Sequence, residues 1–323
     1  MGAYWNGDSF FPETEIASVC GLAGLIDLTP GREWATVESN LKSMTTALSH
    51  RGPDAMGLWS DPSDRVGFGH RRLSIIDTSS AGGQPMHSHN GRYVISYNGE
   101  IYNYRDVRRR LESDGVSFRG GSDTEVLIEA IVHWGHSKAL TQINGMYAYA
   151  LWDRAEKTLT LVRDRLGKKP LYYGWAGQCL LFASELKSFF SHHDCIREVN
   201  VDAQTRFLQL GYVPSTHCIL KNFVALRPGC MVTFTQVSPG LLPPVTPYWS
   251  AEETARLAHR PERGDATDRK GELKALLRDA VKIRLESDVP LGALLSGGID
   301  SSLVVALMQE VSDKPIRTFS IGY

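Results

Sequence analysis

Residues 20–28 read Cys-Gly-Leu-Ala-Gly-Leu-Ile-Asp-Leu, an apolar run that predicts a buried strand starting directly after a cysteine. The apolar residues at 34, 37, 41, 44 and 48 recur every three or four positions, which predicts an amphipathic helix. Similar patterns predict strands over 66–76, 93–97, 146–152, 158–163, 171–175 and 179–183, and helices over 104–114 and 123–134. The last of these helices begins after a Ser122 cap and ends at Gly135. Clustered strands with helices between them indicate an α+β fold whose sheets are covered by helices.

The sequence pattern changes near residue 236, where four prolines fall between 239 and 247 and a polar stretch follows to 272. After it come a predicted helix (about 270–286), a buried strand (291–295), a glycine pair, a second helix from about 300 and a strand (317–321). This order predicts a βαβ unit with parallel strands. Two strands cannot form a covered parallel sheet, so we expect this second domain to be incomplete. The predicted division is an N-terminal extension or propeptide (1–19), a first domain (20–236), a linker (237–263) and the start of a second domain (264–323).

Composition excludes several functional classes. The chain of 323 residues has 35 Lys and Arg against 36 Asp and Glu, so no basic field predicts nucleic-acid or membrane binding. No apolar run approaches the roughly 18 residues of a membrane helix, and the N-terminus lacks a secretory signal, so we expect a cytoplasmic protein. The five cysteines include no Cys-x-x-Cys pair, which argues against a disulfide framework or a zinc ribbon. We also expect His192, His193 and Cys195 to be structural rather than metal ligands.

A series of motifs follows Cys20 in order along most of the chain. They are Arg51-Gly52-Pro53-Asp54, residues 69–77 (GHRRLSIID), 82–86 (GGQPM), 97–103 (YNGEIYN), 121–125 (GSDTE), 163–167 (RDRLG), 183–187 (ASELK) and 296–301 (SGGIDS). Together they resemble the glutamine-hydrolysing asparagine synthetases, whose N-terminal half is a class II glutamine amidotransferase. The resemblance implies an N-terminal-nucleophile hydrolase sandwich with αββα layers. It also implies that an incomplete α/β domain of the ATP-pyrophosphatase type follows.

The resemblance assigns Cys20 as the nucleophile that attacks the glutamine carboxamide. In the family this cysteine is the N-terminal residue and its free α-amine is the base, since an α-amine has a pKa of about 8. The Asn98 side chain and the Gly99 backbone N–H match the family's oxyanion hole, which stabilises the tetrahedral intermediate. From the residues alone, Asn-Gly is also a strong signal for a hairpin turn.

The resemblance also assigns the glutamine-binding residues. Arg72 matches the residue that holds the glutamine α-carboxylate, a task suited to a guanidinium. Asp123 matches the partner of the α-ammonium with help from Glu100, although an acidic residue in the first turn of a helix also stabilises the helix itself. Arg51 is expected to form a buried ion pair near the site. The other assigned positions are Leu73, Ser74, Ile75, Ile76, Asn98 and Gly99.

Residues 296–301 lie between a predicted strand and a helix, where glycines let the backbone approach an oxyanion. The stretch lacks the lysine of a kinase-like P-loop and instead matches the pyrophosphate loop of ATP pyrophosphatases. The implied cofactors are ATP and Mg²⁺, with no prosthetic group, and Asp300 would hold the Mg²⁺ bound to pyrophosphate. Leu294 and Ile321 match positions that contact adenosine. The full set of implied ATP-binding residues is Leu294, Ser296, Gly297, Gly298, Asp300, Ser301 and Ile321.

The resemblance implies glutamine-dependent asparagine synthesis, in which ammonia from L-glutamine attacks an adenylate made from ATP and L-aspartate. In the nearest members of the family the reactive cysteine follows the initiator Met, whereas here 19 residues precede Cys20 and must be removed. Two alternatives stay open. One is a sister amidotransferase that passes ammonia to another carboxylate acceptor in a biosynthetic cluster. The other is a non-catalytic remnant whose nucleophile is masked. A homodimer is also left open.

Overall fold

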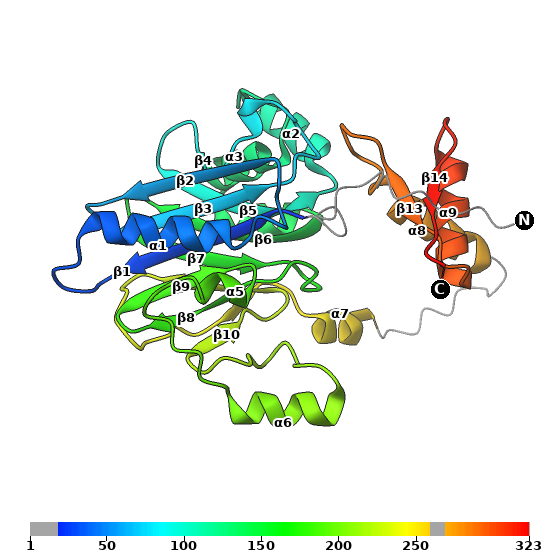
Figure 1. The fold of residues 1–323 in the computed structure, drawn as a ribbon. Coiled ribbons are helices and arrows are strands. Elements are labelled where there is room, and N and C mark those ends of the chain that lie inside the picture. Colours follow the sequence, from blue (N-terminus) through cyan, green and yellow to red (C-terminus); the bar gives the residue numbers. More distant parts are fainter. Residues whose placement is uncertain (1–18, 259–268, 323) are drawn as a thin grey trace, which may run out of the picture.

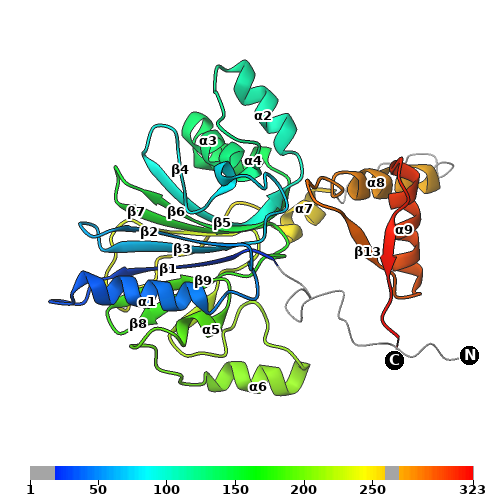
Figure 2. The same cartoon turned by 45° about the horizontal axis from the view of Figure 1, so that its top comes forward.

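The computed structural model describes residues 19–258 and 269–322, and its larger part is a sandwich of two antiparallel sheets. Each sheet has six strands, and helices cover both outer faces (Figures 1 and 2). This is the αββα layering implied by the sequence. None of the helices in the described ranges is long and apolar enough to cross a membrane.

The first sheet contains the strand that follows Cys20. Its order is β10 (Phe223–Ala225), β8 (Tyr172–Ala176), β9 (Cys179–Ala183), β1 (Gly21–Asp27), β3 (Val66–Arg72) and β2 (Ala55–Asp61). Helices α1 (Trp34–Thr46) and α5 (Leu186–Phe189) pack on its outer face. Every residue of β1 is buried, as predicted, because this strand lies inside the sheet with layers on both sides.

The second sheet carries the predicted oxyanion-hole residues. Its order is β12 (Thr246–Pro247), β11 (Cys230–Phe234), β7 (Thr158–Arg163), β6 (Gly145–Asp153), β5 (Tyr93–Ile101) and β4 (Met86–His87). Helices α2 (Tyr104–Ser113), α3 (Asp123–Trp134) and α4 (His136–Gln142) cover its outer face. The ends of α3 confirm the sequence pattern, because Ser122 Oγ accepts a hydrogen bond from Glu125 N and Gly135 follows the last turn.

An apolar core fills the space between the sheets. Phe68 and Phe182 meet edge to face with ring centroids 5.3 Å apart, and Val237, Leu242 and Val245 pack against the same core. The proline pattern predicted a linker or an extended connection for this part of the chain. In the structure, apolar residues of the segment 237–249 pack on the first domain and β12 pairs with β11, so the segment is not a free linker. The rest of the predicted linker contains α7 (Ala251–Ala258), and 259–263 lies outside the described residues.

Several elements were missed by the sequence analysis. Strand β2 is at the edge of its sheet and carries mixed polar residues, so its sequence shows no apolar run. Short elements such as β10, α5 and the 3₁₀ turn Ser80–Gly82 give too few residues for a periodic signal. Helix α6 (Val201–Leu210) extends from the body beyond β10 (Figure 1).

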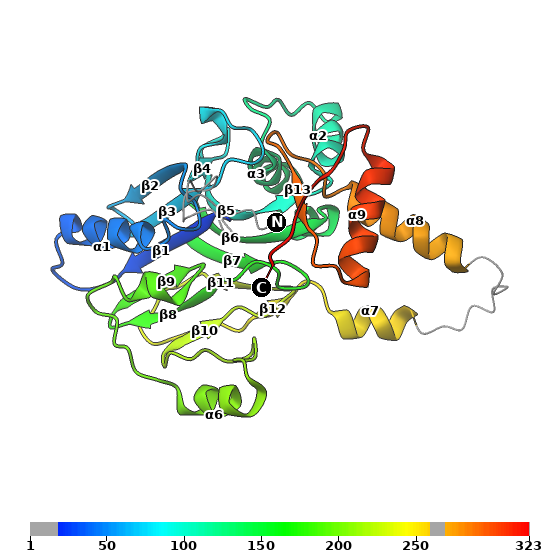
Figure 3. The same cartoon turned by 45° about the vertical axis from the view of Figure 1, so that its right-hand side comes forward.

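The second, smaller unit has the predicted βαβ order. Strands β13 (Gly292–Leu294) and β14 (Arg317–Phe319) are parallel, and helices α8 (Arg269–Lys282) and α9 (Ile299–Val311) pack beside them (Figure 3). Lys274 and Arg278 of α8 form ion pairs with Glu310 of α9. The expectation that β13 is buried is wrong, since Leu294 is 73% exposed. The described residues supply only these two strands to the sheet, so its faces stay largely uncovered.

Asp164 organises the loop that connects β7 to β8, and we expect its charge to be important for stability. The buried carboxylate accepts hydrogen bonds from the backbone N–H groups of Leu166, Lys168 and Lys169 at 2.9–3.1 Å. Asp164→Asn should lower the free energy of unfolding by about 1–3 kcal/mol, because its amide NH₂ would face these donors or leave one unpaired. Urea unfolding measures this change. The matched variant of an exposed carboxylate, Asp313→Asn, should stay within about 0.5 kcal/mol of the original chain, and an equal effect of both variants would contradict the assignment.

Candidate active site

A cleft of about 100 Å³, partly open to solvent, lies where β1 begins and where β3 and β5 end. It brings together the predicted catalytic residues and all the predicted glutamine-binding residues except Ser74. The Ser74 backbone N–H instead donates to Asp54 Oδ2 at 2.8 Å. The lining residues are Val19, Cys20, Arg72, Leu73, Ile75, Ile76, Gly82, Gln84, Tyr97, Asn98, Gly99, Glu100, Ser122, Asp123, Thr124, Met146 and Lys169.

The Cys20 thiol is at the start of β1 and faces the loop after β3. Its Sγ lies 3.4 Å from Leu73 N and 3.5 Å from Leu73 O. Burial raises the pKa of the thiol, so Cys20 needs a base to become nucleophilic. Arg51 Nε donates to Cys20 O at 3.0 Å and its Nη1 pairs with Glu185 at 2.7 Å, which confirms the expected ion pair. Arg51 therefore fixes the backbone of the cysteine rather than its sulfur.

Asn98 and Gly99 lie within β5, so the hairpin-turn alternative is wrong. They pair with Ala148 and Tyr147 of β6. A Cβ atom on Gly99 would lie 2.5 Å from Met146 O, so only glycine allows this close approach of the two strands. Asn98 is buried, and its Nδ2 has no hydrogen-bond partner within the described part of the chain. A buried amide donor left free in a cleft is suited to an oxyanion.

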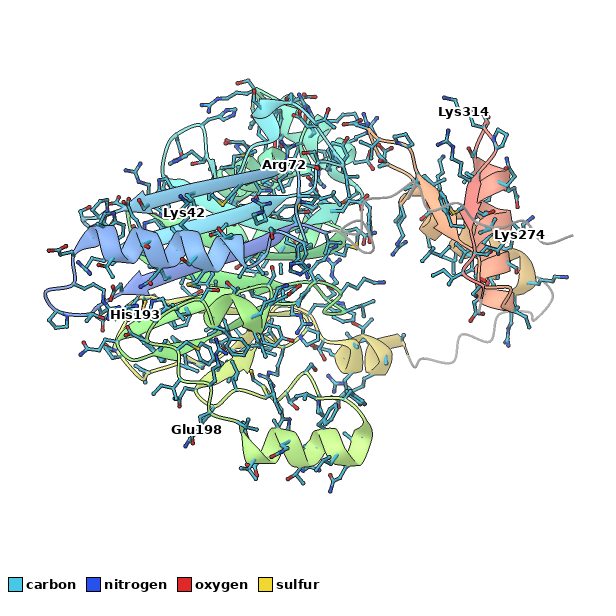
Figure 4. All side chains as sticks on the ribbon, in the orientation of Figure 1. Lys42, Arg72, His193, Glu198, Lys274 and Lys314 are labelled. Atoms are coloured by element: carbon cyan, nitrogen blue, oxygen red, sulfur yellow. The ribbon has the colours of Figure 1, made fainter. Side chains whose placement is uncertain are left out.

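Arg72 is at the end of β3, on the side that faces the second unit (Figure 4). Its guanidinium donates to the carbonyl oxygens of Ser79 at 3.0 Å and Ile76 at 3.4 Å, and also to that of Asp77. Arg72 thus holds the loop that forms one wall of the cleft, a contribution that sequence analysis missed. Because the same side chain lines the cleft, it can also meet a carboxylate there.

Two carboxyl groups lie on the opposite wall. Asp123 begins α3, and its Oδ2 accepts hydrogen bonds from Tyr97 Oη at 2.8 Å and Ile101 N at 2.9 Å. Burial raises the pKa of Asp123. Burial, together with the neighbouring Asp123, also raises the pKa of Glu100 to about 7. The wall can therefore accept a cationic group, whose charge would favour the ionised carboxylates.

Two residues that support this wall were quoted in motifs but given no role by the sequence. Gln84 accepts a hydrogen bond from Tyr97 N at 2.7 Å and donates to Thr124 Oγ1 at 3.3 Å. His70 Nε2 contacts Tyr97 O at 2.8 Å, and burial lowers the pKa of this imidazole to about 4. His70 is therefore neutral and links β3 to β5 across the sandwich. No local pattern distinguishes such tertiary contacts.

The predicted phosphate loop connects β13 to α9. Gly297 has a φ of +82°, Ser296 Oγ lies 3.0 Å from Ser301 Oγ, and Gly298 is the N-cap of the helix. Asp300 is in the first turn, and the loop is solvent-exposed. Leu294 and Ile321 are also exposed. An accessible helix N-terminus with a glycine-rich approach is suited to binding phosphate groups.

The segment before β13 contacts the cleft directly. Asp288 N donates to Ile75 O at 3.0 Å, and its carboxylate accepts from Asp77 N at 2.7 Å. Glu286 pairs with Arg105 at 2.8 Å, and the Arg284 guanidinium lies 4.5 Å from the ring centroid of Tyr102. The second unit thus contacts the loop wall of the cleft through Asp288, and it contacts Tyr102 and Arg105 outside the cleft.

The cluster of His192, His193 and Asp194 has donor atoms within 4.8 Å of one another. Its polar atoms have protein partners, however. Asn40 Nδ2 contacts a ring nitrogen of each histidine, and Arg32 pairs with Asp194 at 2.7 Å. A guanidinium on the carboxylate opposes a bound cation. These contacts favour the structural interpretation.

The raised pKa of Glu100 predicts a pH-dependent stability. Between about pH 4.5 and 7 the unfolded carboxyl loses its proton while the folded one keeps it, so this group destabilises the fold as the pH rises through that range. Glu100→Gln removes the effect. The midpoint of thermal unfolding of this variant, relative to the original chain, should therefore be higher at about pH 8 than at about pH 4.5. The exposed control Glu156→Gln should give the same difference at both pH values, and a Glu100→Gln difference that does not change with pH would show that the carboxyl titrates normally.

Comparison with known proteins supports both parts of this description. Residues 19–249 match the family described as the glutamine amidotransferase domain, and residues 272–323 match the asparagine synthase family. The glutamine-hydrolyzing asparagine synthetase 1 of Bacillus subtilis is 34% identical over 305 residues, which cover 94% of this chain and 46% of that protein. The chain spans about half the length of the curated relatives it matches.

Two solved structures are similar in fold, each at 18% identity over 93% of this chain and 65% of the other. One is the allosteric regulatory enzyme of purine biosynthesis, with a TM-score of 0.52. The other is the glutamine phosphoribosylpyrophosphate amidotransferase of B. subtilis, with a TM-score of 0.50. They confirm the N-terminal-nucleophile hydrolase fold of the sandwich. With the family match over 19–249, this chain belongs to the glutamine amidotransferase domain family, and its residues 272–323 are similar to the asparagine synthase family.

Proposed function

We propose that this protein hydrolyses L-glutamine at Cys20 and uses the ammonia in an ATP-dependent amidation of L-aspartate. The observation that carries the proposal is the cleft in which the Cys20 thiol and the unpartnered Asn98 Nδ2 lie together. A nucleophile beside a free, buried amide donor is the arrangement that amide hydrolysis requires.

Before any glutamine can be hydrolysed, residues 1–19 must be removed, which gives Cys20 a free α-amine. The amine takes the thiol proton, and Sγ attacks the carboxamide carbon of glutamine. Asn98 Nδ2 and Gly99 N–H donate hydrogen bonds to the resulting oxyanion. The C–N bond then breaks, ammonia leaves with the proton returned by the amine, and a thioester remains on Cys20. Water hydrolyses the thioester to release glutamate.

The walls of the cleft bind the rest of the substrate. Arg72 holds the glutamine α-carboxylate, and Asp123 with Glu100 holds the α-ammonium. The assignment places a cation and two carboxyl groups opposite the two charges of an amino acid. Leu73, Ile75 and Ile76 form the remaining wall. Ser74 supports their loop through the hydrogen bond from its backbone N–H to Asp54.

The loop 296–301 binds ATP in this proposal. Its exposed helix N-terminus and glycines fit the phosphates, and the exposed Leu294 and Ile321 fit the adenosine. Asp300 would hold Mg²⁺, which neutralises pyrophosphate charge when bound. The aspartate carboxylate attacks the α-phosphorus of ATP, pyrophosphate leaves, and an aspartyl adenylate forms. Ammonia then attacks the acyl carbon of the adenylate, AMP leaves, and asparagine remains. A cytoplasmic location, expected from the apolar pattern and the N-terminal sequence, and a homodimer complete the proposal.

Cys20→Ala should abolish release of glutamate from glutamine, because no other residue in the cleft is a sulfur nucleophile. Glutamate and ammonia are measured with protein produced from the full-length sequence. N-terminal sequencing of the active original protein should begin at Cys20. Cys195→Ala, which removes a half-buried thiol outside the cleft, should leave the rate unchanged. Glutamate release by the Cys20→Ala variant would contradict the assigned nucleophile. Full activity in protein that retains residue 1 would contradict the α-amine as base.

Arg72→Ala should lower kcat/KM for glutamine by a factor of about 30 to 1,000, equivalent to roughly 2–4 kcal/mol for a lost buried charge partner. Steady-state kinetics measure this change, and thermal unfolding shows how much of it comes from the loop that Arg72 also holds. Arg71→Ala, on the adjacent position of β3, is the control. An unchanged dependence on glutamine concentration in Arg72→Ala would contradict the carboxylate assignment.

A further inference from the structure

Lys169 is a buried cation in the cleft with no assigned role. The residue is 8% exposed and lines the cleft together with Cys20, Glu100 and Met146. Its backbone is held, because its N–H donates to Asp164 Oδ2 at 2.9 Å and its carbonyl accepts from Arg163 Nε at 2.8 Å. No hydrogen bond or ion pair of its ammonium is found among the described residues. A buried charge without a partner is costly, so a counter-charge is expected during function.

The charged groups around Lys169 come from several elements. Cys20 precedes β1, Glu100 belongs to β5 and Asp164 follows β7, and the ionised form of each favours the ammonium. Burial and the neighbouring Arg51 act in the opposite direction and lower the pKa of Lys169. Cys20 has the strongest electrostatic effect on it among these side chains.

The same pairing appears when the pKa of the Cys20 thiol is considered instead of that of Lys169. Asp123 raises the pKa of the thiol, while Lys169 and Arg72 lower it, and the effect of Lys169 is the larger of the two. The Arg72 guanidinium is already bonded to backbone carbonyls of the wall loop. Lys169 is therefore the cation that is available to pair with the sulfur when the sulfur becomes negative.

We propose that Lys169 is a positioning residue whose ammonium serves as the counter-charge of the Cys20 sulfur as it loses its proton and attacks the substrate. The inference deepens the proposed glutamine hydrolysis and rests on it for the identity of the substrate. The behaviour of the thiol itself does not depend on which substrate is used. Because Lys169 acts through Cys20, its removal should change the acidity of the thiol as well as the rate.

The test replaces the charge while keeping the length of the side chain. Lys169→Met is compared with Lys168→Met, which removes the exposed neighbouring ammonium, and with Lys169→Arg, which restores a positive charge. The rate at which iodoacetamide alkylates Cys20 in the full chain is followed against pH by mass spectrometry of the peptide that contains it. This assay separates Cys20 from the other four cysteines.

We expect the midpoint of the Cys20 alkylation profile to rise by about one pH unit in Lys169→Met, since loss of an adjacent opposite charge disfavours the thiolate. The midpoint in Lys168→Met should match that of the original chain. The midpoint in Lys169→Arg should also lie close to it, because arginine keeps the positive charge. In glutamine hydrolysis, kcat should fall about tenfold in Lys169→Met at neutral pH with little change in KM, because the thiolate rather than substrate binding is affected.

An unchanged alkylation midpoint in folded Lys169→Met overturns the proposal, because a purely structural lysine would leave the thiol acidity as it was. If Lys169→Met does not fold, as judged by circular dichroism, Lys169→Gln provides the same comparison with a polar side chain. A chain that alkylates at Cys20 but hydrolyses no glutamine contradicts the proposed function and leaves the alkylation result to decide the role of Lys169.

Discussion

The close pairing of β5 with β6 at Gly99 is the constraint on which the cleft depends. With no side chain at this position, the two strands approach closely enough to keep their ladder intact. The ladder places Asn98 inside the sandwich, where it lines the same cleft as Cys20. Asp123 is then fixed to the same strand through Tyr97 Oη and Ile101 N. One strand therefore determines where the donor and both carboxyl groups lie relative to Cys20.

The wall formed by Leu73, Ile75 and Ile76 is a loop, and hydrogen bonds from two different parts of the chain hold it in position. Arg72 binds its carbonyl oxygens from inside the first domain, whereas Asp288 binds Ile75 and Asp77 from the segment that leads to β13. The loop 296–301, the proposed phosphate loop, begins eight residues after Asp288 in the sequence. If this segment moved, it would either break its hydrogen bonds to Ile75 and Asp77 or move the loop that faces Cys20. The two sites are in this way mechanically connected through backbone hydrogen bonds.

The parts of the fold that could be predicted are those whose signal is local. Strand β1 is a continuous apolar run, and α3 carries its own cap and stop residues. Asn98-Gly99 shows why local signals fail, because a favoured turn sequence is held extended by its pairing with β6. The proline-rich segment after 236 resembled a linker, yet its few apolar residues pack against the core between the sheets. The resemblance supplied the site residues, whereas His70, Gln84 and Lys169 depend on contacts distant in sequence.

Burial shifts the pKa values of four titratable groups in the cleft. Burial raises the pKa of Cys20, Asp123 and Glu100 and lowers that of Lys169, so each group is shifted toward its uncharged form. Val19 also lines the cleft, and while it is attached the Cys20 nitrogen is an amide without a basic lone pair. The sulfur is then a buried thiol with no adjacent base. Release of the α-amine would supply that base, and a zwitterionic amino acid would bring charges that favour ionisation of both walls. Reactivity thus depends on what enters or leaves the cleft, because burial outweighs the effect of Lys169 and Arg72 on the thiol while its nitrogen is an amide.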